Sequence, residues 1–171
     1  MLGDSLSYGL GAESNHGYIC VLQKRLGIEI VNKGVNGDTS KMALDRLQKD
    51  VLDLKPALVL VELGGNDFMQ KVPLDETFAN LDRIITSVQA QQTPVLLIGV
   101  QNGLFSNKAA GRYRKLADLR HTGLVANALS DILTRADLKS DAIHPNDKGY
   151  ERMADEVEPE LRRMLRKLGR L

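Results

Sequence analysis

Apolar residues along the chain follow two different spacings. Residues 57–63 and 95–100 form nearly continuous apolar runs, which are typical of buried strands, whereas apolar positions three and four residues apart between 74 and 88 indicate an amphipathic helix. Applied to the whole chain, the same criteria predict strands at residues 1–2, 28–31, 57–63, 95–100 and 123–126 and helices at residues 18–26, 39–51, 74–88, 113–119 and from 146 onward. Pro159 falls inside the last helix, so we expect a kink or a restart there.

Strands and helices alternate along the chain, and the strands are apolar throughout rather than at every second position. This combination is typical of a parallel sheet with helices packed on both faces. A chain of 171 residues is long enough to bury one sizeable core. The sequence therefore predicts a three-layer α/β/α fold of the α/β class, and we expect residues 1–171 to form a single domain.

Composition and charge narrow the classes of partner. The chain carries 23 Lys and Arg against 22 Asp and Glu, a formal net charge of +1, so it offers no broad basic surface for nucleic acid. No apolar run approaches the roughly 18 residues that a transmembrane helix needs. The single cysteine, Cys20, excludes an internal disulfide and a thiolate zinc cluster. We expect a small-molecule substrate, no nucleic-acid partner, no transmembrane segment, no metal and no cofactor.

Polar segments follow four of the predicted strands, and three of these segments contain glycine. The four segments are residues 3–6, 34–38, 64–67 and 141–145, with the sequences Gly-Asp-Ser-Leu, Gly-Val-Asn-Gly-Asp, Gly-Gly-Asn-Asp and Asp-Ala-Ile-His-Pro. Ligands of open parallel α/β sheets bind outside the carboxyl ends of the strands. We therefore expect the four segments to meet at one edge of the sheet and to form the functional site there.

These segments resemble the four motif blocks of the GDSL or SGNH hydrolases, whose diagnostic residues are Ser, Gly, Asn and His. The corresponding residues are Ser5, Gly37, Asn66 and His144, in the same order and spread over nearly the whole chain. Residues 61–67 look most like the bacterial branch that contains arylesterases, acyl-CoA thioesterases and lysophospholipases.

The resemblance implies a flavodoxin-like fold with a five-stranded parallel sheet in the order 2-1-3-4-5. It also implies hydrolysis of carboxylic esters, and members of the family are often periplasmic or secreted. Relatives have a complete first strand, whereas only two residues precede Gly3 in this sequence. We therefore expect the N-terminal strand to be truncated.

Ser5, His144 and Asp141 fit the roles of a catalytic triad. A serine hydroxyl is a weak nucleophile at neutral pH and needs a base within hydrogen-bond reach, which His144 can supply. Asp141, three residues earlier in a turn that ends at Pro145, can accept the other ring proton and stabilise the imidazolium. We expect Ser5 to form an acyl-enzyme, and the resemblance implies the same roles.

Attack on an ester carbonyl creates an oxyanion, and N–H donors aimed at that oxygen lower the barrier strongly. The candidates are the backbone N–H groups of Ser5 and Gly37 and the side-chain amide of Asn66. A residue without a Cβ at position 37 permits close approach of the backbone. We expect these three donors to converge on the substrate oxygen.

Residues that follow the third and fourth strands are expected to line the substrate pocket. They are Phe68, Met69, Gln101, Asn102, Leu104 and Phe105. The two remaining histidines, His16 and His121, are both interpreted as incidental. The alternative for His16 is a place in the wall of the cleft, because it follows the nucleophile loop.

Each site residue also has a structural interpretation. Ser5 could cap a helix, and Asn66 could take a left-handed turn position. Asp4, Asp38 and Asp67 are interpreted as residues that hold the loops, because the mechanism leaves them no proton to move.

Three other functions stay open on the sequence alone. The first is a carbohydrate acetylesterase of the same family. The second is a non-catalytic phosphate- or nucleotide-binding module, because glycine loops at strand ends also suit anions, although the chain has no Walker pattern. The third is a metal phosphohydrolase that uses Asp4, Asp67 and Asp141.

Overall fold

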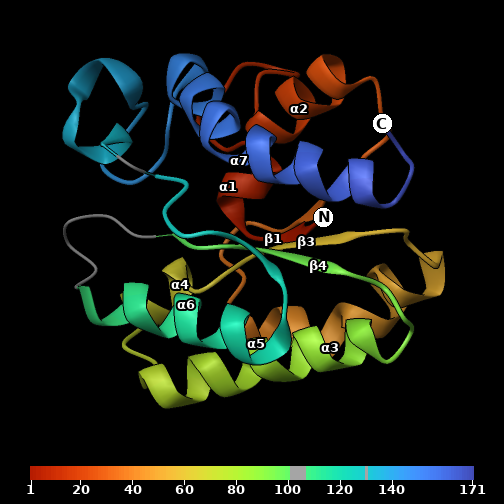
Figure 1. Ribbon diagram of the computed structural model, residues 1–171. Helices are drawn as coiled ribbons and strands as arrows, with labels where there is room; N and C mark the ends of the chain where they lie inside the picture. Colours follow the sequence, from red (N-terminus) through yellow and green to blue (C-terminus); the bar gives the residue numbers. More distant parts are fainter. Residues whose placement is uncertain (101–106, 130) are drawn as a thin grey trace.

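Five short parallel strands form the central sheet of the molecule (Figure 1). A computed structural model describes residues 1–100, 107–129 and 131–171. The strands are β1 (Leu2–Gly3), β2 (Lys33–Gly34), β3 (Val59–Glu62), β4 (Val95–Ile98) and β5 (Gly123–Val125). They lie in the order β2-β1-β3-β4-β5, and every neighbouring pair is parallel. The predicted fold class and strand order are confirmed.

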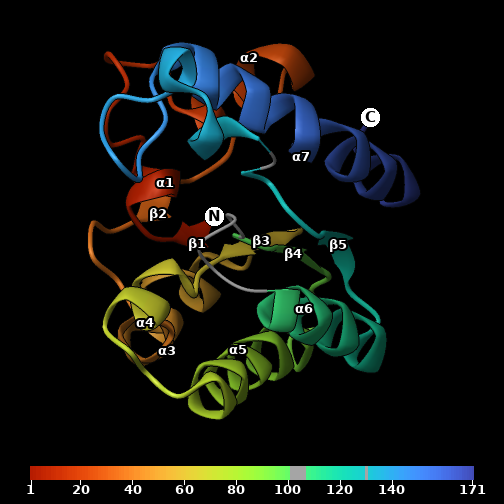
Figure 2. The same cartoon turned by 90° about the vertical axis from the view of Figure 1, so that its left-hand side faces the viewer.

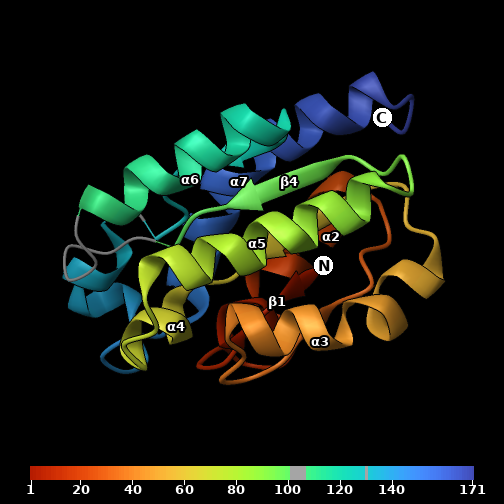
Figure 3. The same cartoon turned by 90° about the horizontal axis from the view of Figure 1, so that it is seen from below.

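Helices cover both faces of the sheet and make three layers (Figures 1 and 2). On one face α2 (Tyr18–Leu26) packs against α7 (Asp147–Lys167). On the other face α5 (Leu74–Gln89) packs against both α3 (Ser40–Asp50) and α6 (Asn107–Arg120). Figure 3 shows these three helices side by side beneath the sheet.

Successive residues of the middle strands belong to different cores, and both cores are apolar. Leu60 and Leu96 pack in the core beneath α2 and α7, whereas Val61 and Leu97 pack in the core of α3, α5 and α6. None of these four side chains is more than 4% exposed. Burial on both faces explains why the strands read as continuous apolar runs. Glu62, at the end of β3, is the exception, because it is a carboxyl group with no exposed surface.

The predicted strand at residues 28–31 is wrong, because the second strand lies at Lys33–Gly34. A strand needs a neighbouring backbone with which to pair, and the two residues of β1 pair with Lys33 and Gly34. Residues 28–31 instead line a cavity of about 460 Å³ at the end of the sheet where the strands begin.

The predicted starts of α3 and α7 agree with the capping chemistry of the sequence, whereas the predicted start of the helix at residue 113 is wrong, because α6 begins at Asn107. Thr39 caps α3 by accepting a hydrogen bond from the N–H of Met42, and Asn146 caps α7 by accepting one from the N–H of Gly149. The predicted restart at Pro159 is wrong, because α7 continues through this exposed proline from Asp147 to Lys167. In the described part of the chain, no helix is both long enough and apolar enough to cross a bilayer.

Two short helices that the hydrophobic pattern does not predict carry part of the site. α1 (Ser5–Tyr8) follows β1, and α4 (Gly65–Met69) follows β3. Short 3-10 turns occupy Leu52–Leu54, Ile132–Thr134 and Ala136–Leu138. Because α1 and α4 begin at the carboxyl ends of neighbouring strands, they bring their first residues to the same edge of the sheet.

Candidate active site

Ser5, His144 and Asp141 form a hydrogen-bonded row at the carboxyl ends of the strands. Nε2 of His144 lies 3.0 Å from Oγ of Ser5, and Nδ1 of the same ring lies 2.8 Å from Oδ2 of Asp141. The other oxygen of Asp141 accepts hydrogen bonds from the backbone N–H groups of Ile143 and His144, both at 2.8 Å. The structure therefore brings together three side chains that come from opposite ends of the sequence.

The turn around Asp141 favours its ionised form. Partial burial acts to raise the pKa of Asp141, but the hydrogen bonds from the N–H of Ile143 and from the His144 ring outweigh this effect. The pKa of Asp141 consequently lies below its usual range. An ionised carboxylate at this position can hold a proton on Nδ1 of His144, which leaves Nε2 free to accept a proton from Ser5.

Ser5 stands at the first position of α1, directly after the N-cap. Asp4 is that cap, because its Oδ1 accepts a hydrogen bond from the N–H of Leu6 at 3.0 Å. The alternative in which Ser5 itself caps the helix is therefore wrong. N–H groups in the first turn of a helix have no partner within the helix, so the Ser5 N–H is not used by α1 itself.

Gly37 occupies a backbone conformation that other residues rarely adopt. Its φ is 82°, in the left-handed region, and an added Cβ would meet no described atom within 4 Å. The local requirement for glycine is therefore conformational rather than steric.

The side-chain amide of Asn66 connects two of the predicted segments. Its Nδ2 donates to the backbone oxygen of Asp38 at 2.9 Å and to Oδ2 of Asp4 at 3.2 Å. The alternative in which Asn66 takes a left-handed turn position is wrong, because Gly64 takes that conformation with a φ of 117°. Asn66 lies within α4, so its amide is held between the nucleophile turn and the segment that contains Asp38.

Two other aspartates hold the loop between β2 and α3. The carboxylate of Asp67 accepts hydrogen bonds from the N–H of Ser40 at 2.7 Å and from its hydroxyl at 2.5 Å. Asp38 forms an ion pair with Arg46 at 2.6 Å. These contacts give Asp38 and Asp67 the loop-holding role that the sequence indicates.

Two carboxyl groups are buried beneath the site. Burial is the main cause that raises the pKa of Asp4 to about 7, and the N–H of Leu6 partly opposes it. Burial, followed by the proximity of Asp4, raises the pKa of Glu62 well above its usual range. The hydroxyl of Ser7 donates a 2.6 Å hydrogen bond to Oε2 of Glu62. The only sign of Glu62 in the sequence is a lone acidic residue inside the apolar run 57–63.

A small cavity of about 40 Å³ opens beside Ser5. The apolar part of its wall consists of Leu6, Met69, Val100, Leu129 and Ile143. Met69 is one of the expected pocket residues, whereas Phe68 is 40% exposed and does not line this cavity. The other expected pocket residues, Gln101, Asn102, Leu104 and Phe105, lie outside the residues that the structure describes.

The carboxylates of the metal phosphohydrolase alternative are engaged elsewhere. Asp4 caps α1, Asp67 holds Ser40 and Asp141 contacts His144. Among the described residues, the one group of three side chains whose ligand atoms lie within 4.8 Å of one another is Glu13, His16 and Asp147.

The two other histidines lie away from the cavity. Nδ1 of His16 lies 3.6 Å from Oδ2 of Asp147 at the surface, and His16 is not among the residues that line the cavity beside Ser5. His121 precedes β5 and so lies at the opposite end of that strand from the site.

Known proteins are similar to this chain over nearly its whole length. Residues 1–152 match the GDSL-like Lipase/Acylhydrolase family. The chain is 34% identical to Esterase TesA of Pseudomonas aeruginosa, over 96% of this chain and 88% of that protein. It is 30% identical to Thioesterase 1/protease 1/lysophospholipase L1 of Escherichia coli K12, over 91% of this chain and 78% of that protein. A crystal structure of TesA aligns with a TM-score of 0.89 at 32% identity and covers 95% of this chain and 97% of its own.

Proposed function

Because the chain belongs to the GDSL-like lipase/acylhydrolase family, we propose that it is a single-domain serine esterase whose nucleophile is Ser5. The observation that carries this proposal is the continuous row of hydrogen bonds from Ser5 through His144 to Asp141, at 3.0 and 2.8 Å. Relatives are named as an esterase and as a thioesterase and lysophospholipase. Carboxylic esters, including thioesters and lysophospholipids, are therefore the proposed substrate class.

In the first half of the reaction, Oγ of Ser5 attacks the carbonyl carbon of the ester. The hydroxyl proton moves to Nε2 of His144, and the resulting imidazolium is stabilised by the carboxylate of Asp141. When the tetrahedral intermediate collapses, the carbon–oxygen bond to the alcohol breaks and His144 returns the proton to the leaving oxygen. The products of this half are the free alcohol and an acyl group bound to Ser5.

In the second half, water takes the place of the alcohol. His144 removes a proton from the water as it attacks the acyl carbonyl, and then gives that proton to Oγ of Ser5 when the acyl bond breaks. The carboxylic acid leaves, and the enzyme returns to its starting protonation state. The same ring nitrogen thus acts as base and then as acid in both halves.

The negative charge on the carbonyl oxygen needs donors that are already in place. The proposed donors are the N–H groups of Ser5 and Gly37 and the side-chain amide of Asn66. The amide of Asn66 donates at 2.9 Å to Asp38 and at 3.2 Å to Asp4. We expect the oxyanion to compete with Asp4 for the hydrogen in the longer bond, while the bond to Asp38 stays.

The cavity beside Ser5 favours a short, apolar acyl group. A volume of about 40 Å³ is small for a ligand site, since such sites usually measure roughly 300 to 1,000 Å³. Met69, Leu129 and Ile143 give its wall apolar surface, which suits the acyl part of an ester. The names of the relatives, rather than this cavity, favour an acyl or aryl esterase over a carbohydrate acetylesterase.

A panel of p-nitrophenyl esters with acyl chains from acetate to dodecanoate tests the proposal. We expect the native enzyme to hydrolyse the short esters fastest and Ser5→Ala to lower kcat by about 10⁴-fold or more. Ser87→Ala, in α5 on the opposite face of the sheet, is the matched control and should keep native rates. Undiminished turnover by Ser5→Ala would overturn the proposal, and activity restricted to acetylated sugars would favour the acetylesterase alternative.

A further inference from the structure

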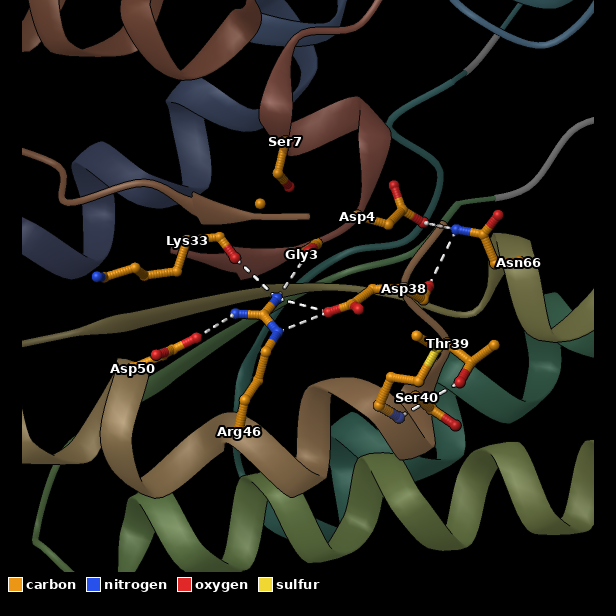
Figure 4. A network of polar contacts seen from close by, with 12 residues as sticks. Gly3, Asp4, Ser7, Lys33, Asp38, Thr39, Ser40, Arg46, Asp50 and Asn66 are labelled. Atoms are coloured by element: carbon orange, nitrogen blue, oxygen red, sulfur yellow. Dashed lines mark hydrogen bonds and ion pairs between the residues drawn. The ribbon is translucent and has the colours of Figure 1, made fainter. Parts of the chain in front are cut away.

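Arg46 of α3 makes five polar contacts that converge from three segments of the chain (Figure 4). Its Nε lies 2.7 Å and its Nη2 lies 2.6 Å from Oδ2 of Asp38. Nη2 also donates to the backbone oxygens of Lys33 at 2.8 Å and Gly3 at 3.2 Å. Nη1 donates to Asp50 at 3.1 Å. The guanidinium therefore joins α3 to the ends of both β1 and β2.

Two of these contacts lie directly beside proposed catalytic groups. Asp38 follows Gly37, and the oxygen of Gly3 belongs to the residue two positions before Ser5. The N–H of Gly37 lies one Cα before the peptide unit that Gly37 shares with Asp38, so a shift of the Asp38 backbone is passed to this N–H through the Gly37 Cα. Arg46 thus spans the short distance between the nucleophile turn and the oxyanion loop, which is defined here as residues 35–40.

The oxyanion loop is held from its other side by α4. Asn66 donates to the oxygen of Asp38 at 2.9 Å, and Asp67 accepts from the N–H of Ser40 at 2.7 Å. Arg46 contacts the loop through Asp38, and α4 contacts it through Asn66 and Asp67. Replacing Arg46 therefore removes the first contact and keeps the other two, so the loop can shift while the fold is kept.

The chemistry of these contacts requires an arginine. The side chains of Arg46 and Asp38 are 18% and 3% exposed, and burying such charges costs free energy that apolar side chains of similar size would not cost. A gain in folding stability alone therefore does not explain why the chain buries the ion pair between Arg46 and Asp38. A guanidinium offers five donors in a rigid plane and can satisfy a carboxylate and two carbonyls together, whereas a lysine ammonium is a single flexible point charge.

We propose that Arg46 is a positioning residue that holds the N–H of Gly37 at the place relative to Ser5 where the oxyanion forms. This inference rests on the proposed esterase function. Arg46 touches neither the nucleophile nor the substrate carbonyl. It acts on the reaction only through the backbone oxygens of Gly3 and Lys33 and through the carboxylate of Asp38.

Arg46→Lys tests this role against a matched control, Arg120→Lys. Arg120 also makes a two-point contact with an aspartate, since its Nε and Nη2 lie 2.5 and 2.7 Å from the two oxygens of Asp82, but this pair joins α6 to α5 away from the site. For each variant, kcat and KM are measured with a p-nitrophenyl ester. The inhibition constant of an alkylboronic acid, which forms a tetrahedral adduct on the nucleophile, is measured alongside.

We expect Arg46→Lys to lower kcat by roughly 10- to 100-fold with KM changed less than about threefold, because displaced donors weaken binding of the tetrahedral state. The boronic acid should bind more weakly by a similar factor. Arg120→Lys should leave all three values within about twofold. A merely structural role would not confine the loss to kcat and to the tetrahedral analogue. Methylguanidinium should restore part of the lost kcat to Arg46→Ala.

A folded Arg46→Lys with native kcat, in a protein whose Ser5→Ala variant is inactive, overturns this inference and leaves the proposed function standing. Turnover by Ser5→Ala overturns both. If Arg46→Lys does not fold, Asp38→Asn replaces it, because this change keeps the size of the side chain and removes the charge that the guanidinium holds. The same loss of kcat is then expected, and an unchanged kcat would overturn the inference.

Discussion

The side-chain amide of Asn66 donates a hydrogen bond to the backbone oxygen of Asp38 at 2.9 Å, across 28 positions of sequence. This bond connects the helix that follows β3 with the loop that follows β2. It fixes the orientation of the amide before any substrate binds. A donor that is held in place costs little reorganisation when the oxyanion forms, because only its bond to Asp4 has to be exchanged.

Asn66→Ala should therefore lower kcat by about 10²- to 10³-fold with a smaller change in KM, since one oxyanion donor is lost. Asn80→Ala is the matched control. Asn80 is also a buried asparagine, and it donates to Oγ of Ser40 at 3.1 Å rather than to the backbone of the oxyanion loop. Steady-state kinetics with one ester compare the two variants. Equal losses of kcat would contradict the role assigned to Asn66.

Two glycines with similar backbone geometry allow the effect of conformational strain to be distinguished from an effect on catalysis. Gly37 and Gly27 have φ values of 82° and 65°, and an added Cβ would meet no described atom within 4 Å at either position. Alanine at either position should lower the free energy of unfolding by about 1 to 2 kcal/mol, because the left-handed conformation disfavours a Cβ. We expect only Gly37→Ala to lower kcat as well. Urea unfolding and ester hydrolysis measure the two effects, and equal activity in both variants would argue against Gly37 as a donor.

Asp141→Asn should lower kcat by about 10³- to 10⁴-fold while the fold is kept. An asparagine can still accept the N–H bonds of Ile143 and His144, but it cannot stabilise the imidazolium, and it can hold the ring in the wrong tautomer. Asp137→Asn, at an exposed ion pair with Arg135, is the control. The measurement is kcat for a single ester, and a loss of less than about tenfold would contradict the role of Asp141.

The buried carboxyl of Glu62 gives a pH-dependent stability with a defined sign. Burial and the proximity of Asp4 raise its pKa in the folded state above the ordinary value of 4.5. The folded protein therefore holds a proton that the unfolded chain has lost, and the free energy of unfolding falls as pH rises from about 4.5 to the folded pKa. Glu62→Gln does not titrate and keeps an acceptor for Ser7. The free energy of unfolding of this variant, measured in urea and compared with that of the native protein, should increase between pH 4.5 and 8. The same pH dependence in both proteins would show that the pKa of Glu62 is not raised.

The strands β3 and β4 and the helix α5 could be predicted because their signal is local, whereas β2 could not, because its position depends on pairing with β1. In β3 and β4, both faces are buried, so residues such as Leu60 and Val61 are apolar in succession. In α5, apolar residues at helical spacing cover one side, and the predicted boundaries agree with Leu74–Gln89. The helices α1 and α4 have four and five residues, which is too short for a period to show.

The supporting side chains could not be predicted, because their contacts depend on the assembled fold. In the sequence, Arg46 is a polar residue on an amphipathic helix, which usually indicates a solvated face. Only when β1 and β2 lie side by side do the oxygens of Gly3 and Lys33 meet its guanidinium. The candidate nucleophile and base could be found from the sequence, because their motifs are short and continuous in it.

Covalent labelling with a fluorophosphonate probe, followed by mapping of the modified peptide, tests the central claim most directly. Phosphonylation requires a serine oxygen activated by a base, so it reports the pairing of Ser5 with His144 at 3.0 Å. We expect one modification per chain on Ser5, no labelling of Ser5→Ala, and labelling of His144→Ala slowed by at least about 100-fold. A label on any other residue, or an active enzyme that the probe does not modify, would contradict the account.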